Sequence, residues 1–142
     1  MKGLIDTSVL VAAIYAEESH HDLCSALLNE PDLSIYSHGI NEVFSTLTGG
    51  RFSIRMSASS AISLLENDYL PGLNIVTLPP NRQLAALREA EIRGVRGGAV
   101  FDYMHLVAAR HAKAPRLYTL NSSNFQAFRR EGDPEVVFPS TP

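Results

Sequence analysis

The stretch Leu4–Leu10 constrains the fold more than any other part of this sequence. A short apolar run ends at Asp6, two small polar residues follow, and an apolar segment with helical spacing then begins. This order is typical of a buried parallel strand that leads into a helix, which Thr7 or Ser8 is placed to cap. Ligands of open α/β sheets bind outside the carboxyl ends of the strands, so Asp6 is a candidate functional residue. Taken alone, it fits a helix cap equally well.

Length and composition favour a single domain over residues 1–142. The length falls in the usual range of about 100–200 residues for one domain, and 45% of the residues are hydrophobic, enough for a core. The single cysteine, Cys24, excludes an intramolecular disulfide, fits a reducing cytoplasm and is expected in the core. No apolar run approaches the roughly 20 residues of a membrane span, and the chain opens on a strand rather than a signal peptide. We therefore expect a cytoplasmic protein without membrane contact.

The charge balance argues against a protein that binds nucleic acid through bulk charge. The formal net charge is −3, whereas such proteins present a strongly basic surface. An enzyme whose acidic centre is offset by a few arginines remains compatible with this charge. Four arginines in or beside expected loops fit phosphate contacts and solvated surface equally well: Arg51, Arg55, Arg93 and Arg96.

Strand-like apolar runs alternate with helical patterns along the chain. After the strand that ends at Asp6, we expect strands at 33–36, 74–78, 116–120 and 135–138. We expect helices at 8–16, 19–28, 57–69 and 99–112, one capped by Ser37, and one after Pro79 whose inner face carries Leu84, Leu87 and Ile92. Such alternation predicts a parallel α/β sheet with helices on both faces.

Three acidic residues stand out because each lies at the end of a strand or near the start of a helix. Asp6 ends the first strand, Glu42 lies in the first turns of the helix after the second strand, and Asp102 begins the helix before the fourth. The turn after the fourth strand offers Asn121 and Asn124. If the first and fourth strands are neighbours, these side chains converge, and the carboxylates raise one another's pKa unless a cation is bound. An all-oxygen set suits Mg²⁺ or Mn²⁺ better than zinc.

Other polar residues have a structural interpretation that competes with a functional one. His20 and His21 are adjacent on an expected helix and point in different directions, so we expect solvated surface rather than metal ligands. The loop Gly94–Gly98 lacks the Lys-Ser/Thr pair of a phosphate-binding loop and does not follow a strand. We expect His105 to be exposed or at the edge of the core. The alternative is a contact with Asp102, which lies on the same side of the helix.

Four segments, taken in order, carry a family resemblance: Leu4–Leu10, Asn41–Val43, Gly98–Asp102 and Thr119–Phe125. With them the chain resembles the PIN-domain family, and more closely the VapC-type toxins of toxin–antitoxin pairs. Each motif is weak alone, but four in the right order over nearly the whole chain are fairly specific. The resemblance implies an α/β fold, a single-domain, three-layer α/β/α sandwich around a mostly parallel five-stranded sheet.

The resemblance also implies a metal-dependent endoribonuclease with Mg²⁺ or Mn²⁺ as cofactor. Asp6, Glu42 and Asp102 match the family's three leading acids and are expected to be catalytic and metal-binding. The family's fourth acid usually precedes the Phe of the last motif, where this chain has Asn124, which keeps a ligating oxygen but no charge. Asp133 is the nearest substitute for that acid. Thr7, Ser8, Thr119 and Asn121 are expected to support the site.

The partners implied by the resemblance are an RNA substrate, a cognate antitoxin that blocks the acidic crevice, and a second copy of the chain in a homodimer. Two rival functions stay open. Asn124 motivates a catalytically weakened module that binds RNA or protein. A strand-end Asp6 also begins phosphatase and phosphoacceptor folds, but one such phosphatase class needs an Asp where Ser8 stands, and Met1–Asp6 leaves no room for a receiver's paired acids.

Overall fold

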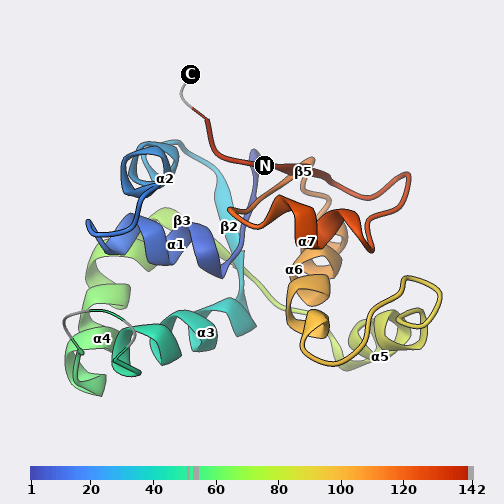
Figure 1. The fold of residues 1–142 in the computed structure, drawn as a ribbon, viewed down its shortest axis with the longest axis horizontal. Helices are drawn as coiled ribbons and strands as arrows, with labels where there is room; N and C mark the ends of the chain where they lie inside the picture. Colours follow the sequence, from blue (N-terminus) through green and yellow to red (C-terminus); the bar gives the residue numbers. More distant parts are fainter. Residues whose placement is uncertain (51, 53–54, 141–142) are drawn as a thin grey trace.

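Five short parallel strands form one sheet in the order β3-β2-β1-β4-β5 (Figure 1). The structure is a computed structural model that describes residues 1–50, 52 and 55–140. The strands are β1 (Gly3–Ile5), β2 (Leu33–Tyr36), β3 (Leu73–Val76), β4 (Arg116–Tyr118) and β5 (Glu135–Val137). In the central strand, Leu4 pairs with Ser34 on one side and Leu117 on the other. The expected parallel sheet is confirmed.

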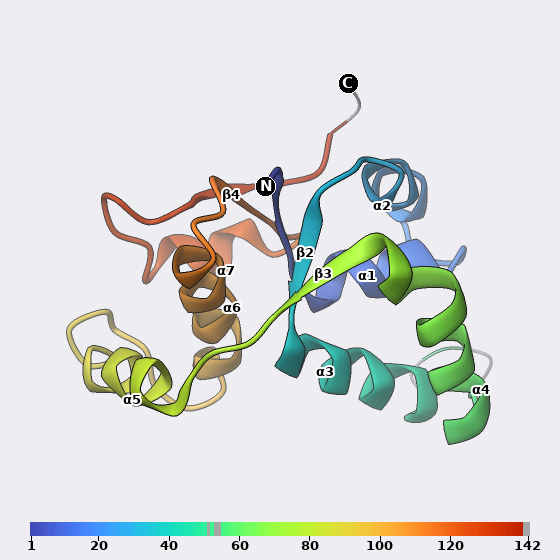
Figure 2. The same cartoon turned by 180° about the vertical axis from the view of Figure 1, so that it is seen from behind.

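Helices cover both faces of this sheet, which gives three layers. The helices are α1 (Thr7–Ile14), α2 (His21–Leu28), α3 (Ser37–Thr48), α4 (Ala58–Leu64), α5 (Pro80–Arg88), α6 (Ala99–His111) and α7 (Ser122–Gln126). A π-helical turn, η1 (Leu65–Tyr69), and a 3₁₀ turn, η2 (Leu70–Gly72), extend α4. Figures 1 and 2 show α1–α4 on one side of the sheet and α5–α7 on the other. Within the described residues, no helix is long and apolar enough to cross a membrane.

A hydrophobic core lies on each face of the sheet, which explains why the sequence of β1 is a continuous apolar run. Ile5 and Ile35 pack into the core beneath α1–α4, whereas Leu4, Tyr36 and Leu117 pack into the core beneath α6 and α7. Successive strand residues point to opposite faces. Because both faces of the sheet are covered, neither can be polar along its central strands.

Asp6 is the N-cap of α1, so the prediction that Thr7 or Ser8 caps this helix is wrong. The Val9 N–H donates to Asp6 Oδ1 at 3.3 Å, and α1 begins at Thr7, one residue earlier than expected. The predicted cap of α3 is wrong for the same reason. Ser37 is its first residue, and the N-cap is Tyr36, whose side chain makes no capping bond. One residue, Asp6, separates β1 from α1, and none separates β2 from α3.

The helix after β3 is less buried than its apolar pattern predicts. Leu84, Leu87 and Ile92 were expected on its inner face, but they are 52, 39 and 80% exposed. The helix α5 ends at Arg88, so Ile92 lies beyond it. Its buried contact is Ala86, whose carbonyl accepts a hydrogen bond from the Tyr103 hydroxyl at 2.9 Å. The expected strand at 74–78 ends at Val76 on the edge of the sheet.

Candidate active site

A cleft of about 450 Å³ lies beyond the carboxyl ends of β1 and β4 and contains the three acids singled out in the sequence. The lining residues are Asp6, Thr7, Ser8, Val11, Glu18, His20, Glu42, Thr46, Asp102, Leu120 and Asn121. They come from the end of β1, from α1, α3 and α6, from the connection between α1 and α2, and from the turn after β4. The strand order makes this possible, because β1 and β4 are neighbours.

Asp6 is held rigidly at the floor of the cleft. It is 2% exposed, and its N–H donates to the Tyr118 carbonyl at 3.1 Å. The Ser8 hydroxyl donates to Asp6 Oδ1 at 2.6 Å and accepts the Leu120 N–H at 3.0 Å, so it ties α1 to the end of β4. The buried Thr119 hydroxyl donates to the same carboxylate.

Two carboxylates in the cleft disfavour each other's charge. Burial raises the pKa of Asp6, against the opposing effects of the His105 imidazole and of the hydrogen bonds from Ser8 and Thr119. Burial also raises the pKa of Asp102, and the charge of Asp6 raises it further. A cation between the two would remove both penalties.

Glu42 is bonded to a buried histidine. His105 is 1% exposed, and its Nε2 lies 2.8 Å from Glu42 Oε1 and 3.5 Å from the Thr7 hydroxyl. His105 Nδ1 is buried and makes no hydrogen bond to any described residue, so we assign the donated proton to Nε2. Burial acts to raise the pKa of Glu42, but the His105 hydrogen bond and imidazole outweigh it and the net pKa is lowered.

The prediction that His105 is exposed or at the core edge is therefore wrong. The residue is fully buried, and it contacts Glu42 rather than the acid on its own helix. The Thr7 hydroxyl also bonds Glu42, which brings α1, α3 and α6 together at one point.

The turn after β4 begins earlier than the sequence predicts, because β4 ends at Tyr118 and Asn124 already lies in α7. The Asn121 N–H donates to Thr119 Oγ1 at 2.9 Å, and Asn121 lines the cleft. Asn124 is exposed, and its side chain donates to Asp102, which acts to lower the pKa of that acid. The residue that stands in place of the usual fourth acid thus contacts an acid of the cleft.

The donor set fits a hard divalent cation through two carboxylates rather than three. Among the described residues, no three His, Cys, Asp or Glu side chains lie close enough together to hold one metal ion. Glu42 is directed to His105, whereas Asp6 and Asp102 face the cleft without an opposing cationic side chain among its lining residues. Oxygen ligands favour Mg²⁺ or Mn²⁺.

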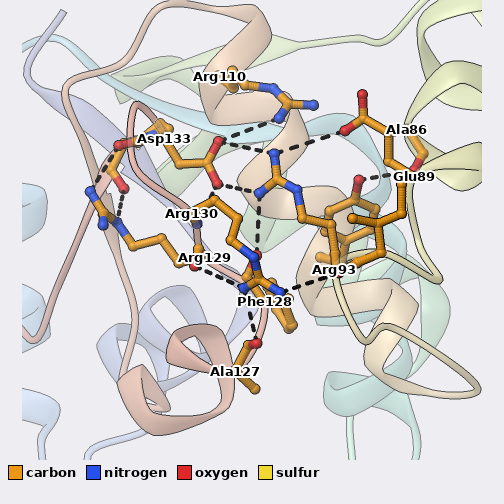
Figure 3. Close-up of polar contacts among 12 residues, drawn as sticks. Ala86, Glu89, Arg93, Arg110, Ala127, Phe128, Arg129, Arg130 and Asp133 are labelled. Carbon is orange, nitrogen blue, oxygen red and sulfur yellow. Dashed lines mark hydrogen bonds and ion pairs between the residues drawn. The ribbon is translucent and has the colours of Figure 1, made fainter.

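Asp133 does not replace the missing acid, contrary to the alternative drawn from the sequence. It is buried away from the cleft among arginines, as Figure 3 shows. Its Oδ2 lies 2.5 Å from Arg93 Nη1, and its Oδ1 lies 3.3 Å from Arg110 Nη1. The Arg130 N–H also donates to Oδ2 at 2.9 Å. Arg93, a candidate phosphate contact, is thereby engaged in an internal ion pair.

The other candidate arginines differ in their surroundings. Arg96 is exposed in the loop before α6, and Arg55 is exposed with its guanidinium against Gly50. Arg51 lies outside the described residues.

The adjacent histidines are less solvated than predicted. His21 Nδ1 lies 2.8 Å from the Ala12 carbonyl, and His20 lines the cleft. Two further lining residues, Glu18 and Thr46, were not singled out in the sequence. Thr46 follows Glu42 by one helical turn, a spacing that would have identified it. Glu18 follows α1 and carries no comparable signal.

A sequence model of the PIN domain family matches residues 3–131. Similar solved structures include VapC20 from Mycobacterium tuberculosis, a sarcin-ricin loop cleaving toxin, with 16% identity, a TM-score of 0.69, and coverage of 92% of this chain and 98% of that one. VapBC2 from Rickettsia felis, bound to a promoter DNA fragment, has 17% identity and a TM-score of 0.67 over 95% and 96% of the two chains. A toxin–antitoxin complex from Klebsiella pneumoniae has 18% identity and a TM-score of 0.65 over 97% and 98%.

No curated protein matches the chain significantly in sequence. The solved structures are similar in fold, and the family model spans most of the sequence, including the segments that supply Asp6, Glu42 and Asp102. The chain belongs to the PIN domain family.

Proposed function

We propose that this protein is a divalent-metal-dependent endoribonuclease and the toxin of a toxin–antitoxin pair. The observation that carries the proposal is the convergence of Asp6 and Asp102 in one cleft, where burial raises the pKa of both. Such a pair gains most from a bound cation. The fold shared with VapC proteins supports the same reaction class.

Asp6 and Asp102 would hold Mg²⁺ or Mn²⁺, Glu42 would complete the set through water, and Asn124 directly or through water. When bound, the ion lowers the pKa of a water molecule and stabilises charge on the phosphate. Ser8 and Thr119 fix the Asp6 carboxylate for this task.

Glu42 would orient the attacking water. The His105 bond keeps its carboxylate ionised and fixes one oxygen, while the residue still lines the cleft. Asp102, whose pKa is raised, is the alternative proton acceptor from that water.

The test is RNA cleavage by the Asp6→Asn variant with Mg²⁺ or Mn²⁺, with cut sites mapped on cellular RNA. Asn keeps the side-chain oxygen that caps α1 but removes the charge, so we expect a loss on the order of a hundredfold. Asp22→Asn, at an exposed position on α2, is the matched control and should cleave normally. Undiminished cleavage by a folded Asp6→Asn variant would contradict the proposal.

A catalytically weakened binding module is the second candidate. It is favoured by the engagement of Glu42 with His105 and by the uncharged Asn124. Tight RNA or protein binding without hydrolysis over a broad RNA panel would replace the first candidate with this one.

The proposed protein partners are a cognate antitoxin and a second copy of the chain, and the proposed site of action is the cytoplasm. Several similar structures are toxin–antitoxin complexes. Coexpression with the product of a small neighbouring reading frame should yield a complex that no longer cleaves RNA. Light scattering of the isolated chain should give the mass of a dimer.

A further inference from the structure

A second, shallower hollow of about 500 Å³ adjoins the acidic cleft. Its lining residues are Thr7, His38, Asn41, Glu42, Ser45, Thr46 and Phe101. Three of these residues, Thr7, Glu42 and Thr46, also line the cleft, so the two spaces lie next to each other.

An exposed aromatic pair forms part of this hollow. The rings of Phe101 and His38 are stacked, with centroids 5.7 Å apart and an angle of 14° between their planes. Phe101 is 50% exposed although it lies in the first turn of α6, next to Asp102. His38 lies on α3, one turn before Glu42, and its other neighbour is the Tyr36 ring at 6.2 Å. The pair therefore joins the two helices that carry two of the three acids.

The chemistry of the hollow fits a nucleobase better than an apolar peptide. A helix docked in a groove needs several apolar anchors at helical spacing, whereas Phe101 is the one apolar side chain that lines this hollow. The remaining lining residues include Asn41, Ser45 and Thr46, whose amide and hydroxyl groups can bond the edge of a base. Aromatic faces bind unpaired bases by stacking, with little dependence on sequence.

We propose that the Phe101–His38 pair stacks against an unpaired nucleobase of an RNA strand whose adjacent phosphate lies at Asp6 and Asp102. This inference rests on the proposed ribonuclease function and names the form of its substrate. A base within a duplex cannot present its face to the pair, so the enzyme would cut single-stranded segments and loops.

The test uses short single-stranded RNAs that carry the fluorescent base 2-aminopurine at each position in turn. In the Asp6→Asn protein, which we expect to bind RNA but to cut it far more slowly, fluorescence should be quenched at one position of the RNA. Adding Phe101→Leu removes the ring but keeps apolar bulk, and should abolish the quenching and weaken RNA binding about tenfold. Phe101→Tyr retains the ring and should retain the quenching. Ile92→Ala removes an 80% exposed apolar side chain outside both hollows and serves as the matched control.

The outcomes separate the two proposals. If wild-type protein cleaves RNA but quenching is absent or indifferent to Phe101→Leu, the stacking inference is overturned and the nuclease function stands. If quenching depends on the ring but no RNA is cleaved under any metal condition, the nuclease function fails and the base-binding hollow stands. If Phe101→Leu instead converts a dimer into a monomer with unchanged quenching, Phe101 belongs to a protein interface and the inference is wrong.

Discussion

The charge of Asp102 in the cleft would favour a bound cation, but it lowers the stability of the folded chain. Burial and the charge of Asp6 both oppose the ionisation of Asp102 and raise its pKa. A carboxylate whose pKa is higher in the folded than in the unfolded chain destabilises the folded state above that pKa. Stability and function therefore make opposite demands on this residue.

We expect Asp102→Asn to stabilise the metal-free protein by about 1 kcal/mol, because it removes the repulsion with Asp6. Urea denaturation in the presence of a chelator measures this difference. Mn²⁺ should raise the midpoint of the wild type but not of the variant. A loss of stability in the metal-free variant would mean that the two carboxylates do not repel each other in the folded chain.

A substitution at Asn124 adds a negative charge to the cleft instead of removing one. Asn124→Asp places a carboxylate beside Asp102, where the amide now donates a hydrogen bond. The added charge should tighten Mn²⁺ binding about tenfold and lower stability without metal. Calorimetric titration of Mn²⁺ into both proteins measures the change. An unchanged titration would remove position 124 from the metal site.

At the scale of secondary-structure elements, one buried acid joins α5, α6 and the segment after α7. Asp133 bonds Arg93 beyond α5 and Arg110 in the last turn of α6, and the Arg129 guanidinium donates to the Asp133 and Pro134 carbonyls (Figure 3). This network fixes the connection that leads into β5.

Asp133→Asn should lower the free energy of unfolding by about 3 kcal/mol, because it removes the buried carboxylate that pairs with Arg93 and Arg110. Burial acts to raise the pKa of Asp133, but the arginines outweigh it and the net pKa is lowered. The stabilisation is therefore complete above the unfolded-state pKa of about 4 and is lost as pH falls through the lower, folded value. Denaturation at several pH values should show this acid-dependent loss in the wild type and not in the variant.

The strands, most helices and the acids of the cleft could be predicted because their signals are local. The expected strand at 33–36 and the expected helix at 99–112 match β2 and α6 within one residue. The partners of His105 and Asp133 could not be predicted in this way, because Glu42 and Arg93 are 63 and 40 residues distant in sequence. The inner face of α5 was mispredicted because the helix packs on α6 through Ala86 alone among its buried residues, so most of its apolar pattern is not buried.

The formal net charge of the molecule is −3, but its basic and acidic residues are unevenly distributed along the chain. Nine of the twelve Lys and Arg residues lie in 80–142, the part that supplies α5, α6 and α7, whereas nine of the fifteen acidic residues lie in 1–79. The two helical layers of Figure 1 thus differ in sign of charge. A substrate polyanion would be attracted to the basic layer and reach the acids from that side.

Arg96 is the exposed arginine nearest in sequence to the start of α6, so Arg96→Gln should weaken RNA binding several-fold for all sequences alike. The slope of log affinity against log salt should fall by about one. Fluorescence anisotropy at several salt concentrations measures both quantities. Arg116→Gln is the control, because Arg116 lies at the amino end of β4, whereas the cleft lies at the carboxyl ends of the strands. Equal losses in the two variants would indicate general charge attraction rather than a contact at Arg96.

The central place of β1 also determines when the cleft can form during synthesis. The Asp6 N–H donates to the Tyr118 carbonyl, and the Asp6 carboxylate accepts from the Thr119 hydroxyl, more than a hundred residues later in the chain. Contacts of such long sequence separation form late and slow the folding of the chain that contains them. A nascent chain on the ribosome therefore lacks the cleft until β4 has emerged, so under the proposed function it could not cut the messenger and ribosomal RNA beside it during translation.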